Sequence, residues 1–255
     1  MVQKHPFWFA EIHPFYYTAY NNLGNLYFDF FKNANQENKQ DYLNMSVEDL
    51  EESLKVYSVE EYPFEYARSQ NNLGTTYQTM ASISDPQSAY FKAIGYFENS
   101  LRVFTIDTYP FNYAMGKFNI GTSYYKLWFI TNDIANLESA LIAVDEALKV
   151  YTLTSYPINY AKCQELLWNI YYDLSANLDH KKNLFKSIDA CHAALQVYTL
   201  NNYLMEYCNI LLHLGDTYKC LAKFENSKEN HKKAQGYHDK VKQLLNIEET
   251  VYVKL

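Results

Sequence analysis

Residues 62–77 read YPFEYARSQNNLGTTY, and 47 residues later the chain reads YPFNYAMGKFNIGTSY at 109–124. The same stretch returns as YPINYAKCQELLWNIY at 156–171 and, without its proline, as YLMEYCNILLHLGDTY at 203–218. A step of 47 residues that holds through four copies indicates stacked structural repeats, each a small supersecondary unit. The repeat therefore decides the fold.

The quoted stretch predicts a first helix over about residues 63–81. Pro63 suits the first turn of a helix, where its missing N–H would have no partner anyway. Behind it, Tyr66, Leu73, Tyr77 and Met80 recur at three- and four-residue steps, which places them on one helical face.

A second helix is predicted in each repeat, after an Asn or Asp that also recurs. These side chains can accept a hydrogen bond from the free N–H groups of a first helical turn, so we expect five N-caps, at Asn38, Asp85, Asn132, Asp179 and Asn226. The following stripe is amphipathic and comprises, in the first repeat, Leu43, Val47, Leu50, Leu54 and Tyr57. No strand is needed to explain the pattern.

Small residues mark where the two helices of a repeat cross. The first helices carry Gly24, Gly74, Gly121 and Gly215, and the second carry Ser46, Ala93, Ala140, Ser187 and Ala234. Helices packed 8–10 Å apart need little side chain at the crossing. The fourth repeat has Trp168 in place of glycine, so we expect either a relaxed approach there or a displaced neighbouring helix.

The motif Asn71-Asn72-Leu73-Gly74-Thr75-Thr76-Tyr77, followed by Ala93, Phe97 and Ser100, resembles the tetratricopeptide repeat (TPR). The family unit is about 34 residues, so this is a long-helix variety with roughly thirteen more. The resemblance implies an all-α fold, a right-handed α-solenoid in one domain. Its five units cover approximately 14–61, 62–108, 109–155, 156–202 and 203–246, after a leader or helix extension over 1–13 and before a short C-terminal tail.

Composition excludes several classes of protein. The 255 residues are 48% hydrophobic, include 26 Tyr and carry a formal net charge of −7, with eight carboxylates between Asp41 and Glu65 against one lysine. This charge disfavours nucleic acid, and no apolar stretch approaches the ~18 residues of a membrane span. The N-terminus carries no secretory pattern, so we expect a cytoplasmic protein without membrane association.

Chemistry-bearing motifs are missing from the sequence. Cys163, Cys191, Cys208 and Cys220 form no CxxC pair and suggest reduced, buried thiols, and no phosphate loop, HExxH or nucleophile motif occurs. We therefore predict no enzyme activity, no catalytic residue, no metal site and no cofactor.

The resemblance places a partner-binding groove along the first helices. The groove residues it implies are Asn22, Asn25, Arg68, Asn72, Asn119, Tyr125, Lys162, Asn169 and Tyr172. An Asn amide offers one donor and one acceptor group, which matches the alternating N–H and C=O of an extended peptide. The alternative is that these amides bond only to neighbouring helices. The two-carboxylate clamp of chaperone-binding relatives is not expected, because Asn21, Met115 and Asn119 occupy its three basic positions.

Three functions remain open at this point. The first is a non-catalytic adaptor or scaffold that binds a neutral or basic protein or peptide. The second is a regulatory receptor for a short signalling peptide or small ligand. The third is a structural homo-oligomer, possible as a homodimer through apolar surface at the ends of the array.

Overall fold

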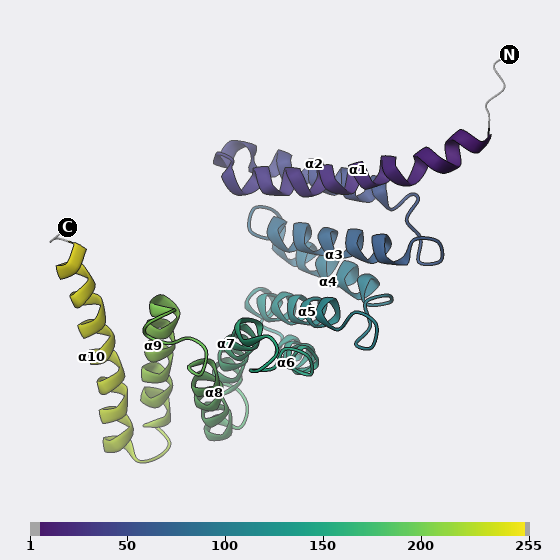
Figure 1. Ribbon diagram of the computed structural model, residues 1–255. Helices are drawn as coiled ribbons and strands as arrows, with labels where there is room; N and C mark the ends of the chain where they lie inside the picture. The colour runs from purple at the N-terminus through teal and green to yellow at the C-terminus, as the bar shows by residue number, and fades with distance from the viewer. Residues whose placement is uncertain (1–5, 253–255) are drawn as a thin grey trace. The chain divides into compact units, whose positions relative to one another are not determined.

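The computed structural model describes residues 6–252, with side chains for residues 18–35 and 37–245. It contains ten α-helices in consecutive pairs and no strand within the described part of the chain (Figure 1), which confirms the predicted all-α solenoid of helix-turn-helix units. The helices are α1 (Pro6–Asn33), α2 (Lys39–Ser53), α3 (Pro63–Met80), α4 (Pro86–Ser100), α5 (Pro110–Thr131), α6 (Ile134–Leu148), α7 (Pro157–Leu174), α8 (His180–Ala194), α9 (Leu204–Leu221) and α10 (Ser227–Tyr252), with a 3-10 turn at Gln36–Asn38.

The chain forms two compact halves, residues 1–147 and 148–255. The N-terminal half holds the pairs α1/α2, α3/α4 and α5/α6, and the C-terminal half holds α7/α8 and α9/α10. The first helix of each pair is termed its A helix and the second its B helix. Helix α1 begins at Pro6, so residues 6–13 belong to the first A helix, while residues 1–5 lie outside the described part.

An aromatic pair recurs at the corner where one pair of helices leads to the next. The ring after each B helix meets the tyrosine that precedes the next A helix, edge to face, with centroids 5.4–5.7 Å apart: Tyr57 with Tyr62, Phe104 with Tyr109, Tyr151 with Tyr156 and Tyr198 with Tyr203. The first member of each pair is buried. Several of the 26 tyrosines therefore fix the chain's direction between repeats.

The B helices begin where the sequence predicts, but the predicted caps are mostly wrong. Asp85 accepts a hydrogen bond from the Ser88 N–H at 3.4 Å, as expected of an N-cap. Asn38 makes no such bond, and Asn132, Asp179 and Asn226 adopt left-handed backbone conformations with φ of 53°, 41° and 41°. Asn and Asp tolerate this region, so these three serve as turn residues instead.

The turns use a different recurring residue, which the sequence reasoning missed. The amides of Asn183 and Asn230 donate to the backbone carbonyls of Leu178 and Glu225, at 2.7 and 2.8 Å. Asn136, another 47 residues earlier, donates to the Thr131 hydroxyl at 2.9 Å. In this repeat Asp133 caps α6 by accepting from the Ala135 N–H at 3.0 Å. A side chain inside the B helix thus closes each turn that contains a left-handed residue.

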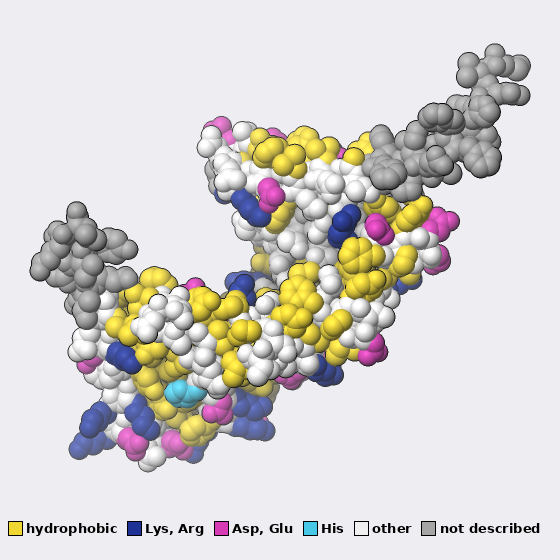
Figure 2. All heavy atoms as spheres, viewed as in Figure 1, with side chains coloured by type: hydrophobic (Ala, Val, Ile, Leu, Met, Phe, Trp, Pro, Cys, Tyr) yellow, Lys and Arg dark blue, Asp and Glu magenta, His cyan; other side chains and the backbone are white. Residues whose placement is uncertain are grey.

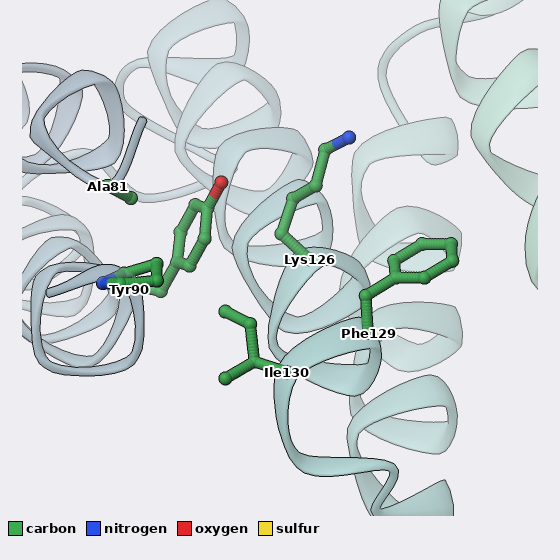
Figure 3. A pocket seen from close by; sticks show the side chains of 6 residues that line it. Ala81, Tyr90, Lys126, Phe129 and Ile130 are labelled. Atoms are coloured by element: carbon green, nitrogen blue, oxygen red, sulfur yellow. The ribbon is translucent and has the colours of Figure 1, made fainter. Parts of the chain in front are cut away.

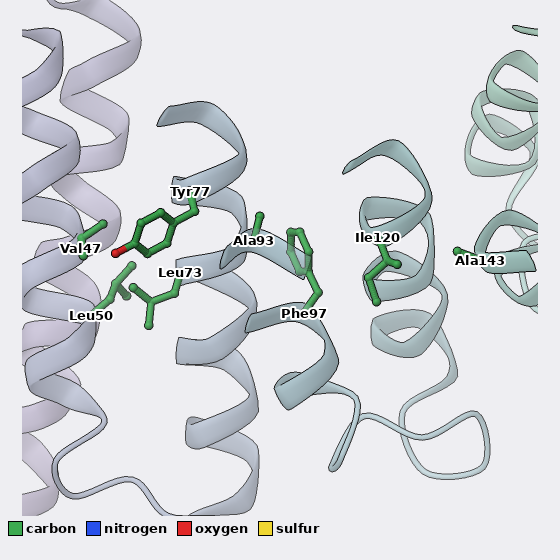
Figure 4. Close-up of a cluster of buried hydrophobic side chains, with 8 residues drawn as sticks. All are labelled: Val47, Leu50, Leu73, Tyr77, Ala93, Phe97, Ile120 and Ala143. Carbon is green, nitrogen blue, oxygen red and sulfur yellow. The ribbon is translucent and has the colours of Figure 1, made fainter. Parts of the chain in front are cut away.

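The glycines of the A helices are covered by large side chains of their own B helices. A Cβ at residue 74 would lie 2.6 Å from the Phe97 ring, and one at residue 121 would lie 2.8 Å from Val144. Leu50 covers Gly24 in the same way, and the His238 imidazole covers Gly215. Figure 4 shows Phe97 within the cluster of buried side chains that joins neighbouring repeats of the N-terminal half.

The fourth repeat reverses this arrangement. Trp168 stands at the glycine position and is 2% exposed, and the covering position 23 residues later holds the small Cys191. The Ser187 hydroxyl donates to the Trp168 carbonyl at 2.9 Å, so α7 and α8 still approach closely. The expectation of a relaxed or displaced crossing is therefore wrong. The indole instead packs against His213 of α9, with ring centroids 5.0 Å apart.

None of the helices in the described residues combines the length and the apolar character needed to cross a bilayer.

Candidate functional site

The A helices of the N-terminal half are hydrogen-bonded to one another. The buried Asn21 amide on α1 donates to the Ser69 hydroxyl on α3 at 2.7 Å. The Gln78 amide on α3 donates to the Ser123 hydroxyl and the Asn119 carbonyl on α5, at 3.0 and 3.2 Å. These side-chain bonds fix the lateral register of α1, α3 and α5.

Three asparagines occupy the same position on these neighbouring helices, two residues before the glycine. We call Asn22, Asn72 and Asn119 the asparagine ladder. Asn22 is exposed and the other two are half-buried, and none of the three side chains has a hydrogen-bond partner among the described residues. The ladder therefore presents three unused amides on adjacent helices.

Arg68 lies on α3 beside the ladder. It precedes Asn72 by four residues and so lies one turn away on the same face. Its Nε is buried without a hydrogen-bond partner, and so is Oδ1 of the neighbouring Asn71, a residue that is only 8% exposed. Leaving such a group unpaired costs about 1–3 kcal/mol. An incoming carbonyl, carboxylate or water would satisfy the arginine, and a donor would satisfy Asn71.

Two other predicted amides are already engaged within their own helices. The Asn25 amide donates to Asn21 Oδ1 at 3.3 Å, and the Asn169 amide donates to the Glu165 carbonyl at 3.0 Å. Lys162 is exposed on α7 in the C-terminal half. Burial and the nearby Glu206 raise the pKa of the Glu165 carboxyl, and Lys162 opposes that rise.

The two predicted groove tyrosines pack into the protein. Tyr125 is 9% exposed and stands edge-to-face against Phe129, with centroids 5.1 Å apart. Tyr172 shares a hydrogen bond with the Cys220 sulfur at 3.2 Å and meets the His213 ring edge-on. Burial and this bond to Cys220 raise the pKa of the Tyr172 phenol. Tyr125 therefore offers no open stacking surface, and Tyr172 is half-buried with its hydroxyl engaged.

The structure also contains a cavity that the sequence reasoning did not identify. It holds about 370 Å³ between the start of α4 and the last turn of α5, and is lined by Ala81, Pro86, Tyr90, Lys126, Phe129 and Ile130. Figure 3 shows the Tyr90 hydroxyl and the Lys126 ammonium directed to the same side. Helix α5 has 22 residues against 18 in α3, α7 and α9, and the unchanged 47-residue period gave no signal of this extra turn.

A second open cavity, of about 330 Å³, lies between α2 and α4. The rings of Tyr77 and Tyr96 stack there at 5.3 Å, and the Tyr96 hydroxyl donates to Glu51 at 3.0 Å. The Lys92 ammonium already lies 5.0 Å from the Tyr77 ring centroid. The chain's own lysine thus uses the cation-binding surface of this cavity.

Metal and thiol chemistry find no organised site in the described part. No group of three His, Cys, Asp or Glu side chains lies there in a position to hold a metal ion. All four cysteines are free, and burial raises the pKa of the Cys163 thiol to about 12. A thiol with so high a pKa stays protonated at neutral pH and is a poor nucleophile.

No protein-family model matches this chain, and a search of curated proteins finds no significant relative.

Proposed function

We propose that this chain is a non-catalytic adaptor of the TPR type, which binds an extended peptide or protein segment across α1, α3 and α5. The observation that carries the proposal is the asparagine ladder with Arg68 beside it. Four polar side chains on three neighbouring helices have no partner among the described residues. Each asparagine can donate to a peptide carbonyl and accept from a peptide N–H, while Arg68 can hold a carbonyl or carboxylate.

The charge of helix α2, which packs against α1 and α3, favours a neutral or basic partner. Helix α2 exposes Asp41, Glu48 and Glu51, and carboxylates continue beyond its end at Glu60 and Glu61. Burial and the neighbouring Glu48 and Glu52 raise the pKa of the Asp49 carboxyl, in keeping with the negative charge that accumulates here. An acidic segment would be repelled by α2 even where Arg68 attracts one of its groups.

A displayed library of unstructured peptides, selected on the purified chain, tests this proposal. Binding of a selected peptide should weaken about tenfold in Arg68→Ala and again in Asn72→Ala, because each loses hydrogen bonds worth about 1–1.5 kcal/mol. Arg102→Ala is the matched control, since Arg102 is the other arginine and lies exposed after α4. Equal losses in the control, or selected peptides indifferent to both changes, would reject the ladder as the site.

The cavity between α4 and α5 favours a second candidate, a receptor for a small ligand. Its apolar wall and paired polar groups suit a molecule with one apolar body and one acceptor or anionic end. Thermal shifts across a library of small carboxylic acids test it. A shift lost in Phe129→Ala but kept in Phe91→Ala, an exposed phenylalanine outside the cavity, would place the ligand there.

A further inference from the structure

Helix α1 carries an apolar stripe that faces away from the rest of the N-terminal half. Its members are exposed: Ala19, Leu23, Leu26 and Phe30. Figure 2 shows hydrophobic side chains gathered over the α1/α2 pair. Phe30 is held against the Tyr42 ring of α2, with centroids 5.8 Å apart, so this part of the stripe is pre-ordered.

The same positions are covered in the next repeat. With Gly24 aligned on Gly74, the stripe corresponds to Ser69, Leu73, Thr76 and Met80 of α3. Helix α2 covers this face, since the Ser53 hydroxyl donates to the Ser69 hydroxyl at 2.9 Å and the Ser46 and Thr76 hydroxyls share a hydrogen bond at 3.3 Å. In a solenoid each repeat buries its face against its neighbour. The stripe on α1 is thus a stacking face without a cover among the described residues.

At two positions the exposed copy is also more apolar than the buried copy in the second repeat, although the fourth and fifth repeats bury Ile170 and Ile210 at these positions. Leu26 is 45% exposed, whereas its counterparts Thr76 and Ser123 are buried hydroxyl residues. Ala19 likewise replaces the buried Ser69. A leucine where the second and third repeats carry hydroxyls is unfavourable in water and favourable against another apolar surface. This face therefore fits an apolar partner.

The opposite end of the chain does not supply that partner. Between repeats, the covering B helix contributes a leucine. Leu101 of α4, for example, lies so close to Gly116 of α5 that a Cβ added at residue 116 would be 2.9 Å from the leucine side chain. The leucine recurs as Leu54, Leu148 and Leu195, but α10 has the exposed Lys242 in its place. Head-to-tail stacking of two copies would bury this lysine without a partner.

The stripe is complementary to itself. Its residues are spaced four, three and four apart, which is the seam of a two-stranded coiled coil. In an antiparallel pair with a two-fold axis between residues 24 and 25, each Leu23 faces a Leu26 and each Ala19 faces a Phe30. Each alanine thus faces a phenylalanine at the two ends of the contact, and leucine faces leucine at its centre, which suits close packing.

We propose that two copies of this chain associate through α1 as an antiparallel, two-fold symmetric pair along the stripe Ala19, Leu23, Leu26 and Phe30. No ladder residue belongs to the stripe, so the proposal does not rest on peptide binding, although Asn22 lies at the edge of the stripe, one turn before Leu26. A single helix–helix contact is small and belongs with weak, reversible interfaces. The pair therefore dissociates on dilution.

Sedimentation equilibrium over a dilution series tests the pairing. The mass should rise from the monomer value of 30.0 kDa toward twice that value as concentration increases. Leu26→Glu should keep the chain monomeric throughout, because it places a carboxylate in the centre of the apolar seam. The matched control is Ile142→Glu on α6, since Ile142 is 68% exposed and lies off the stripe; it should associate like the wild type. Circular dichroism of both variants verifies that they fold.

A mixing experiment tests the register. Leu23→Lys and Leu26→Glu each weaken association alone, but their mixture should form a heterodimer. In that heterodimer the introduced ammonium faces the introduced carboxylate, and the unchanged leucines still face each other. A wild-type chain that stays monomeric at every concentration, or a dimer that survives Leu26→Glu, overturns the proposal. Growth beyond a dimer shows head-to-tail stacking instead, and a mixture no stronger than its components overturns the antiparallel register.

Discussion

The second and fourth repeats solve one packing problem in opposite ways. In the second, Gly74 on the A helix leaves a space that the Phe97 ring of the B helix fills. In the fourth, Trp168 on the A helix fills space itself, and the B helix carries Cys191 at the covering position. Both crossings are buried, and both keep a small residue, Ala93 or Ser187, next to the A helix.

This comparison shows that each crossing combines a larger residue from one helix with a smaller one from the other, and that either helix can supply the larger one. Protein interiors are packed to nearly uniform density, so a large residue on one helix requires a small one on the other. The same exchange explains the remaining repeats, where Leu50, Val144 and His238 cover glycines. Four predictions, ordered by expected effect, test these crossings and the His213 ring that packs against Trp168.

Removing the Trp168 indole should give the largest loss of stability. Trp168→Gly should lower the free energy of unfolding by about 4–6 kcal/mol, because a buried aromatic residue is lost and a glycine enters a helix. Adding Cys191→Phe converts the fourth repeat to the pattern of the second and should recover about 2 kcal/mol. Urea denaturation measures both. If the double variant is no more stable than Trp168→Gly alone, the two positions do not exchange volume.

Replacing two glycines of the second repeat by alanine should change the free energy of unfolding in opposite directions. Gly74→Ala should destabilise by about 1–3 kcal/mol, because its Cβ would come within 2.6 Å of the Phe97 ring. Gly95→Ala on α4 meets open space and should stabilise by about 0.5–1 kcal/mol through helix propensity alone. Thermal unfolding of the pair separates packing from propensity. Equal signs would contradict the close crossing at residue 74.

A smaller effect is expected from the hydroxyl that closes the fourth crossing. Ser187→Ala removes the hydrogen bond to the Trp168 carbonyl and should cost about 1 kcal/mol. The second and third repeats have Ala93 and Ala140 at this position, so the substitution is sterically tolerated. Urea denaturation should reveal the loss, and an unchanged midpoint would show that the bond contributes nothing.

The smallest effect is a dependence on pH. Burial lowers the pKa of His213 below its ordinary value of 6.5, and the nearby Asp216 carboxylate opposes this shift. A lowered folded pKa means that the unfolded chain binds the proton more readily, so the stabilising contribution is complete above about pH 6.5 and is lost as the pH falls through the folded value. His213→Asn, which copies the ladder residues, should flatten the stability profile below about pH 6.5. A profile unchanged by the substitution would show that His213 titrates as if exposed.

The repeat and its helices could be predicted because their signals are local. Apolar residues at three- and four-residue steps, Pro63 at a helix start and the 47-residue period can all be read from the chain without knowing its contacts. Most of the N-cap predictions were wrong because an Asn or Asp before a helix is an ambiguous signal. An Asn before a helix fits both an N-cap and a left-handed turn. Asn226 adopts the left-handed conformation, and its turn is closed by the Asn230 amide, which donates to the Glu225 carbonyl.

The candidate site was predicted only in part. The asparagine ladder lies on neighbouring A helices because its members share one repeat position, and Arg68 lies on α3 four residues before Asn72. Tyr125 has the same phase as a groove residue, yet it is buried because α5 runs one turn longer and brings Phe129 against it. The cavity between α4 and α5 arises from the same extra turn and has no motif of its own.

By itself, the sequence determined the period, the all-helical pairs and the polar positions along the A helices, because a helix repeats its faces whatever surrounds it. Only the tertiary structure decided which side chain fills each crossing, which amides remain without partners among the described residues and that the α1 stripe has no cover there. These outcomes depend on contacts between residues far apart in the chain, such as Gly74 with Phe97 and Asn21 with Ser69. Volume and hydrogen bonding are settled between such distant pairs, and no local pattern encodes them.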